Sequence, residues 1–328
     1  MTPTTDNDDK QAVIKGFTLL LLTSALWGSA FVFQKNATQH LDAFSFNFLR
    51  FAIAIVTLLC LRLLPRHLFR PDEKDIPQQR RLRHSAWFIG VGSGVLMFLG
   101  ITLQQLGLSY TTAGKSGFLT ALYIILVPIL ALFVGQRCRM EVWVGTLLTF
   151  LGVFFLGSGG VVDDLESQFN TGDILTLICA LAWAAQVLWL GIFARYADVL
   201  TVATLQVAVV SLLSAATMGF FWLTQEGGGY ALPTLENIWA AKIDLLYTGV
   251  ISAGVAFTLQ ILGQRYVSAT NAALLMSFEA VFALVTGVIF LGEQVTLVAL
   301  LGCLCIFAGI ILAQLQGKVF PNLLKARG

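Results

Sequence analysis

The sequence predicts an all-α polytopic membrane protein with ten transmembrane helices, arranged as two inverted five-helix repeats. Three observations predict this fold class: the composition, a series of apolar spans of helix length, and an internal repeat. Hydrophobic residues make up 57% of the 328 residues and charged residues only 12%, whereas a soluble domain carries about 25% charged residues. With a mean hydropathy of +0.81, the chain has more apolar surface than one water-soluble core could bury.

Apolar stretches of about 20 residues, each enough to cross a bilayer core, recur along the chain. Continuous apolar runs predict helices rather than the alternating strands of a barrel. We interpret the first span as a retained helix and not as a cleaved signal peptide, because the repeat requires it. The predicted spans are residues 16–35, 44–64, 86–108, 113–134, 142–158, 172–194, 199–222, 244–264, 269–291 and 296–315.

The distribution of Lys and Arg predicts which ends of the spans face the cytoplasm. The segment 62–84 alone holds seven of these residues, and the segments that alternation places on the same side hold nine more. The opposite side holds only Lys35 and Lys242. We therefore expect a multi-pass membrane protein with both termini cytoplasmic.

An internal repeat has an offset of 156 residues. TLQQLGLSYTTA at 102–113 and TLQILGQRYVSA at 258–269 match at seven of twelve positions, and the same offset pairs Trp27 with Trp183. Because each copy holds an odd number of spans, the second copy enters the membrane from the opposite side, an inversion typical of secondary transporters. The predicted parts are a first repeat at 1–157, an external acidic linker at 158–172, a second repeat at 173–316 and a cytoplasmic tail at 317–328.

Five motifs, in order along nearly the whole chain, resemble the drug/metabolite transporter superfamily in its EamA-type branch. They are ALWGSAF at 25–31, FNFLRFAIA at 46–54, FLTALYIILVPIL at 118–130, FEAVFAL at 278–284 and LGEQVT at 291–296. The resemblance implies a ten-helix exporter or permease of small organic solutes in the bacterial inner membrane. Two positions depart from the family pattern: Ala280 stands where Pro often follows the carboxylate, and Gln136 replaces a Glu in the first repeat.

Three ionisable residues within or near the spans are candidates for substrate binding or coupling. Glu279 lies roughly 15 Å into its span at 1.5 Å per residue. It should face the bundle interior, either as a proton-coupling or amine-binding group or as a structural ion pair or helix–helix hydrogen bond. Arg50 either holds a substrate carboxylate, pairs with Glu279, or braces loop carbonyls. Lys115 either attracts anionic groups or snorkels to the interface.

Polar amides and aromatic rings, several at repeat-related positions, predict the walls of a solute cavity near the midplane. The alternative for the amides is interhelical hydrogen bonding, which is common in membrane bundles. The candidates for this wall are Trp27, Trp183, Gln104, Gln260, Gln186, Tyr123, Asn271 and Gln206.

These patterns favour a secondary active transporter that exports small organic metabolites, such as amino acids or related compounds, by alternating access, with proton coupling through Glu279 as a hypothesis. A facilitative uniporter or channel is an alternative, and so is a carrier of sugar phosphates or nucleotide sugars, which would need more intramembrane Lys and Arg. We expect no enzyme, because HExxH and GxSxG motifs are absent. The expected partners are the solute and the lipid bilayer, without nucleic acid, cofactor, metal or an obligatory oligomer.

Overall fold

The computed structural model of the protein describes residues 6–64, 85–110, 113–136, 138–158, 170–224, 232–291 and 295–315. All regular structure in these ranges is helical. Eight helical stretches are long and apolar enough to cross a membrane, and two shorter apolar helices cover Phe118–Phe133 and Met140–Leu156. The predicted all-helical class is therefore confirmed over the described ranges, while the count of ten transmembrane helices stays a prediction.

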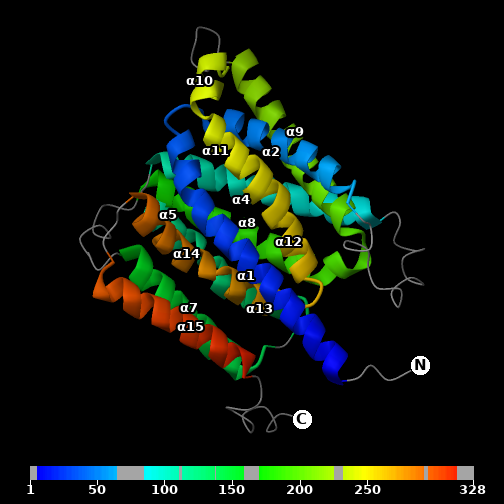
Figure 1. Ribbon diagram of the computed structural model, residues 1–328, viewed down its shortest axis with the longest axis vertical. Helices are drawn as coiled ribbons and strands as arrows, with labels where there is room; N and C mark the ends of the chain where they lie inside the picture. Colours follow the sequence, from blue (N-terminus) through cyan, green and yellow to red (C-terminus); the bar gives the residue numbers. More distant parts are fainter. Residues whose placement is uncertain are drawn as a thin grey trace.

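The described residues of the first half form six helices (Figure 1). They are α1 (Asp6–Ala37), α2 (Ala43–Leu61), α4 (Ser85–Tyr110), α5 (Ala113–Thr120), α6 (Tyr123–Phe133) and α7 (Met140–Ser158). Asp42 begins α2, because its side chain accepts hydrogen bonds from the backbone N–H groups of Phe44 and Ser45 at 2.9 and 3.1 Å. The predicted span 113–134 is divided at residues 121–122 by a tight turn, in which the Ile124 N–H donates to the Ala121 carbonyl at 3.0 Å.

The second half begins at Asn170, which forms a capping box with Asp173 at the start of its first helix. One predicted span, residues 244–264, contains a ten-residue π-helical segment, which apolar periodicity does not reveal. The elements are α8 (Thr171–Phe193), η4 (Ala194–Tyr196), α9 (Val199–Thr224), α10 (Leu235–Ala240), α11 (Lys242–Leu246), the π-helix η5 (Tyr247–Ala256), α12 (Phe257–Gly263), α13 (Ala269–Met276), α14 (Phe278–Thr286), the π-helix η6 (Gly287–Leu291) and α15 (Leu297–Gln314).

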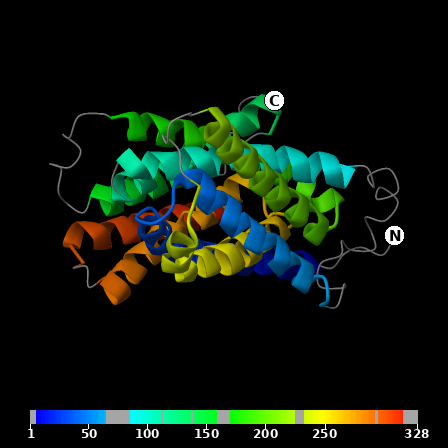
Figure 2. The same cartoon turned by 90° about the horizontal axis from the view of Figure 1, so that it is seen from above.

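The helices form one bundle in which the two halves of the chain interleave. In Figure 1, α1 crosses the bundle from lower right to upper left and packs on α12, α13 and α14, while α4 packs on α8 and α9. Helices α7 and α15 form a pair along one side of the bundle in Figure 1, and Figure 2 shows the same bundle from above. Each of these contacts joins a helix of the first half to a helix of the second half.

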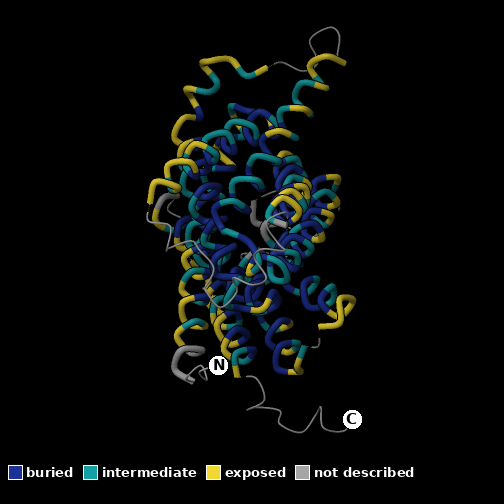
Figure 3. Tube along the Cα trace, turned by 90° about the vertical axis from the view of Figure 1, so that its right-hand side faces the viewer, coloured by how far each residue is buried: buried dark blue, intermediate teal, exposed yellow. Residues whose placement is uncertain are grey.

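Buried residues gather along the axis of the bundle and exposed residues cover its flanks (Figure 3). The exposed positions include large apolar side chains such as Leu304 and Trp87, each 64% exposed. A belt of apolar side chains on the outside is what a bilayer requires, because lipid tails replace water as the solvent there. The fold therefore has a buried interior and an apolar lateral surface.

Contacts near the ends of the helices define two ends of the bundle. At the first, the Lys15 ammonium lies 5.2 Å from the centre of the Tyr266 ring. Arg265 donates hydrogen bonds to the carbonyls of Ala194 and Ala197 there. We call this the basic end, because Lys and Arg side chains meet there.

At the opposite end, which we call the far end, Asn36 donates a hydrogen bond to the Asp244 carboxylate at 3.0 Å. Asn237 donates to the carbonyl of His40 at 2.9 Å, and Lys35 donates to the carbonyl of Leu108 at 3.1 Å. α1 therefore runs from the basic end to the far end, and α11 begins beside the end of α1.

Candidate functional site

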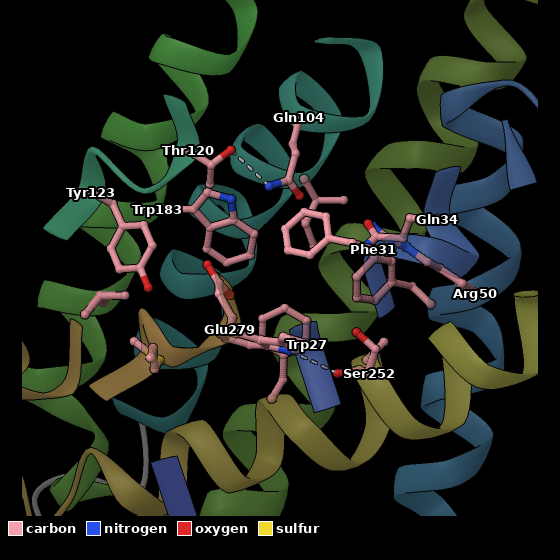
Figure 4. A pocket seen from close by; sticks show the side chains of 16 residues that line it. Trp27, Phe31, Gln34, Arg50, Gln104, Thr120, Tyr123, Trp183, Ser252 and Glu279 are labelled. Carbon is pink, nitrogen blue, oxygen red and sulfur yellow. Dashed lines mark hydrogen bonds between the residues drawn. The ribbon is translucent and has the colours of Figure 1, made fainter. Parts of the chain in front are cut away.

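A cavity lies at the centre of the bundle and encloses about 610 Å³ of space free of atoms, its opening included. Helices from both halves contribute to its wall (Figure 4). The residues predicted from the sequence that line the cavity are Trp27, Trp183, Glu279, Arg50, Gln104 and Tyr123.

Three aromatic rings form a continuous patch on this wall. The Trp27 ring lies 4.7 Å from the ring of Phe257 and 6.2 Å from that of Trp183, centre to centre. The rings of Trp183 and Phe257 are stacked, with an interplanar angle of 8°. Trp27 Nε1 also donates a hydrogen bond of 3.4 Å to the carbonyl of Ser252 in the π-helix η5. We call Trp27, Trp183 and Phe257 the aromatic wall; it offers flat apolar surface to a solute.

Glu279 projects into the cavity from the start of α14 (Figure 4). The backbone of Glu279 lies close to α1 at Gly28. A Cβ atom at Gly28 would be only 2.5 Å from the Glu279 carbonyl oxygen. Among the residues that the structure describes, the Glu279 carboxylate has no hydrogen-bond or ion-pair partner. A lone carboxylate inside a membrane protein is costly, so a bound proton or a cationic ligand would lower its free energy.

Arg50 lines the cavity from α2 and is 4% exposed. Its Nη1 donates a hydrogen bond of 3.0 Å to Gln34 Oε1, and its guanidinium lies 4.8 Å from the ring centre of Phe46 and 5.0 Å from that of Phe51. Neither an ion pair with Glu279 nor a bond to a loop carbonyl forms within the described part of the chain. The guanidinium therefore faces the cavity without a protein anion.

Gln186 and Gln260 do not line the cavity, contrary to the expectation for that wall. Gln260 Nε2 donates to Gln186 Oε1 at 3.1 Å, and Gln186 Nε2 donates to Gln206 Oε1 and to Ser93 Oγ, both at 3.3 Å. All four side chains are fully buried and bond to one another across four helices, while Gln206 Nε2 has no partner among the described residues. We call Ser93, Gln186, Gln206 and Gln260 the glutamine cluster. It is the interhelical alternative that the sequence left open.

One further candidate is not brought to the cavity. Asn271 lies in the first turn of α13, where its backbone N–H donates to Ser268 Oγ at 3.4 Å, and it is absent from the cavity lining. It lies two helical turns before Glu279 in the chain, toward the basic end. The side chain of Lys115 lies outside the described residues.

The repeat offset relates the cavity to the glutamine cluster. An offset of 156 residues pairs Gln104 with Gln260 and Arg50 with Gln206. The members from the first repeat line the cavity, whereas their counterparts are sealed within the glutamine cluster. Equivalent positions of the two repeats are thus in different environments in this structure.

Several lining residues were not among the sequence candidates. Phe31 and Gln34 follow Trp27 by four and seven positions on α1, so helical spacing from that tryptophan places them on the same face. Ser252 and Phe257 belong to η5 and the start of α12. A π-helix changes which residues share a face, so ordinary helical spacing could not have found these two.

The EamA-like transporter family model matches residues 14–158 and 170–315 of the chain. The chain therefore belongs to the EamA-like transporter family, and the two matches confirm the predicted duplication. It is a multi-pass membrane protein and a transporter rather than an enzyme.

Curated relatives agree with this assignment. An uncharacterized transporter of Archaeoglobus fulgidus is 33% identical over 299 residues, which cover 90% of this chain and 85% of the relative. The uncharacterized transporters YrdR and YoaV of Bacillus subtilis are 25% and 22% identical, over 91% and 89% of this chain and 90% and 94% of their own lengths. A crystal structure with 20% sequence identity and a TM-score of 0.68 covers 94% of this chain and 98% of the other, and shows the fold alone.

Proposed function

We propose that the chain is a secondary active transporter that exports small organic metabolites, such as amino acids or related compounds, by alternating access. The observation that carries this proposal is one central cavity whose wall combines a carboxylate, a guanidinium and an aromatic wall from both repeats. Sites of secondary transporters lie near the midplane between repeats. The different environments of Gln104 and Gln260 support the same mechanism, because alternating access requires equivalent halves to exchange open and closed arrangements.

The proposal includes ten membrane crossings, inverted repeats and both termini in the cytoplasm. The alternation of helix ends between the basic end and the far end supports this part of the proposal, in which the two shorter apolar helices are also crossings. Single cysteines in place of Arg62 and Lys242, in a cysteine-free background, test the orientation. A membrane-impermeant thiol reagent added to intact cells should label position 242 and leave position 62 unlabelled. The reverse pattern would contradict the proposed orientation.

Proton coupling through Glu279 is the finer part of the proposal. Its support is a cavity-facing carboxylate without a partner among the described residues. The test is transport into liposomes with and without a pH gradient, for the unmodified protein and for Glu279→Gln. Metabolites that accumulate outside cells overproducing the protein supply the solutes to be tested. Transport that is indifferent both to the gradient and to the substitution would remove the proton role.

The second candidate is a facilitative uniporter or channel, which an open cavity also suits. Saturable counterflow of labelled solute distinguishes a carrier from a channel, and indifference to every ion gradient distinguishes a uniporter from a coupled carrier. A carrier of sugar phosphates is disfavoured, because Arg50 is the only cation among the described residues that line the cavity.

A further inference from the structure

We propose that Arg50 binds a carboxylate group of the transported solute, whose apolar body lies against the aromatic wall. This inference rests on the proposed transport function and specifies the chemistry of its substrate. It assigns the substrate two necessary features: one singly charged anionic group with two oxygen atoms, and a flat or apolar part close to that group. A solute that also carries an amine can present it to Glu279, which lines the same cavity.

The first argument is the state of the Arg50 charge. A guanidinium remains protonated under physiological conditions, so its burial has to be offset by an anion or by several acceptors. Its one hydrogen bond to a side chain goes to the neutral amide of Gln34, and Nε has no partner among the described residues. The rings of Phe46 and Phe51 attract the cation but accept no N–H···O bond from it. The cavity is the open side from which an anion can reach it.

The second argument is the unfilled hydrogen-bonding capacity around Arg50. Asn47 lies three residues before it on α2, is fully buried, and has neither its side-chain nitrogen nor its oxygen paired in the described structure. Gln105 on α4 donates to the Gln34 carbonyl at 3.5 Å, while its own side-chain oxygen lacks a partner in the same ranges. Native proteins leave few buried polar atoms unpaired. Unpaired polar atoms therefore lie in the helices next to Arg50, although neither Asn47 nor Gln105 itself lines the cavity.

The third argument concerns the kind of anion. A planar guanidinium matches the two oxygens of a carboxylate in a bidentate pair, and Gln34 fixes its orientation by accepting from Nη1. Glu279 lines the same cavity, so a dianion such as a phosphate monoester would be repelled by one carboxylate and attracted by only one cation. A monocarboxylate balances the charge of Arg50 without that excess. The aromatic wall lines the same cavity as the two ionisable residues and accounts for the apolar body.

The experiment measures binding to the purified full-length protein in detergent, by the change in tryptophan fluorescence. The probes are 3-phenylpropanoate, its neutral isostere 3-phenylpropanamide, and phenylphosphonate. We expect the unmodified protein to bind the carboxylate about tenfold more tightly than the amide, and more tightly than the phosphonate. Arg50→Gln should abolish the difference between carboxylate and amide. Arg50→Lys keeps the positive charge but loses the planar pair of N–H donors. It should therefore retain part of the difference that Arg50→Gln abolishes. The matched control is Arg62→Gln, at the basic end of the same helix, which should bind as the unmodified protein does.

Equal affinities for carboxylate and amide in the unmodified protein overturn the inference, and so does the lack of saturable binding of all three probes. These comparisons use only the unmodified protein, so they test the proposal even if the Arg50→Gln protein misfolds. Tighter binding of the phosphonate would replace the carboxylate by a phosphoryl group. Liposome counterflow separates this inference from the proposed function. Transport without any preference for carboxylates contradicts the role of Arg50 but leaves the transport function standing. Carboxylate binding without transport contradicts the transport function but leaves the carboxylate site standing.

Discussion

Substituting Gly152 should separate α7 from α15, the helix pair along one side of the bundle. The two backbones meet without a side chain between them. A Cβ atom at Gly152 would lie 2.6 Å from the Gly302 carbonyl oxygen, and one at Gly302 would lie 2.7 Å from the Gly152 carbonyl oxygen. Small residues that permit such close approach are typical of helix pairs in membranes, where packing replaces the hydrophobic effect as the driving force.

The expected cost of Gly152→Ala follows from that geometry. The new methyl would sit about 0.8 Å inside an ordinary van der Waals distance of 3.4 Å, and the clashing atom is a backbone oxygen that cannot rotate away. If the helices move apart to relieve this clash, a gap of about 0.5–1 Å opens along the rest of the interface. Each pair of contacting atoms there loses about a quarter to a half of its dispersion energy. Overpacking of this kind typically costs about 1–3 kcal/mol. The higher helix propensity of Ala offsets about 1 kcal/mol of this, so we expect a net loss of up to about 2 kcal/mol.

The assay is reversible unfolding in mixed micelles by titration with SDS, followed by circular dichroism. The matched control is Gly219→Ala in α9, because a Cβ atom at Gly219 would meet no atom within 4 Å. That variant should be as stable as the unmodified protein or slightly more stable. If Gly152→Ala unfolds at the same SDS fraction as Gly219→Ala, the close crossing does not determine the stability of this pair. Binding of 3-phenylpropanoate should survive in both variants, since neither residue lines the cavity.

Three further predictions concern the cavity and its surroundings. Gly28→Ala should push α1 away from the Glu279 backbone and lower the transport rate about tenfold in a liposome assay, because misplacing a functional group by about 1 Å is costly. An unchanged rate would show that this contact does not position the carboxylate. Gln186→Leu should lower the free energy of unfolding by about 1–3 kcal/mol in the SDS titration, because each interhelical hydrogen bond contributes about 0.6–1.7 kcal/mol; a more stable variant would contradict this account of the glutamine cluster. Trp27→Phe should weaken 3-phenylpropanoate binding less than Trp27→Ala does, since an aromatic ring remains, although it is smaller than indole and lacks the bond to Ser252. Equal affinities of the two variants would exclude ring contact.

The helical class and the duplication were predictable because both depend on properties that the sequence carries directly. Apolar runs of span length admit few structures in lipid, and a repeat persists as matching residues at a constant offset. Trp27 and Glu279 were identifiable for a related reason. A polar or charged side chain at mid-depth has to turn toward the interior, and the interior of this bundle holds a cavity.

The parts that were not predictable depend on which partner a buried group finds. An amide such as Gln186 can face a solute or another amide, and both solutions satisfy its hydrogen bonds equally well. The sequence also gives no sign of the π-helix that turns Ser252 toward the cavity, or of the turn at residues 121–122. These details are decided by tertiary packing around each position, which a pattern along one chain does not contain.

The difference between the two repeats at one pair of positions has a physical reason. Arg50 faces a cavity that an anion can enter, so its charge can be balanced by a ligand. Its counterpart Gln206 is fully buried and accepts a hydrogen bond from Ser93. An arginine at that position would be an unpaired charge sealed away from any ligand, at an effective cost of several kcal/mol. The neutral amide lets the glutamine cluster close in the second repeat, while the first repeat retains the cation that we assign to the solute.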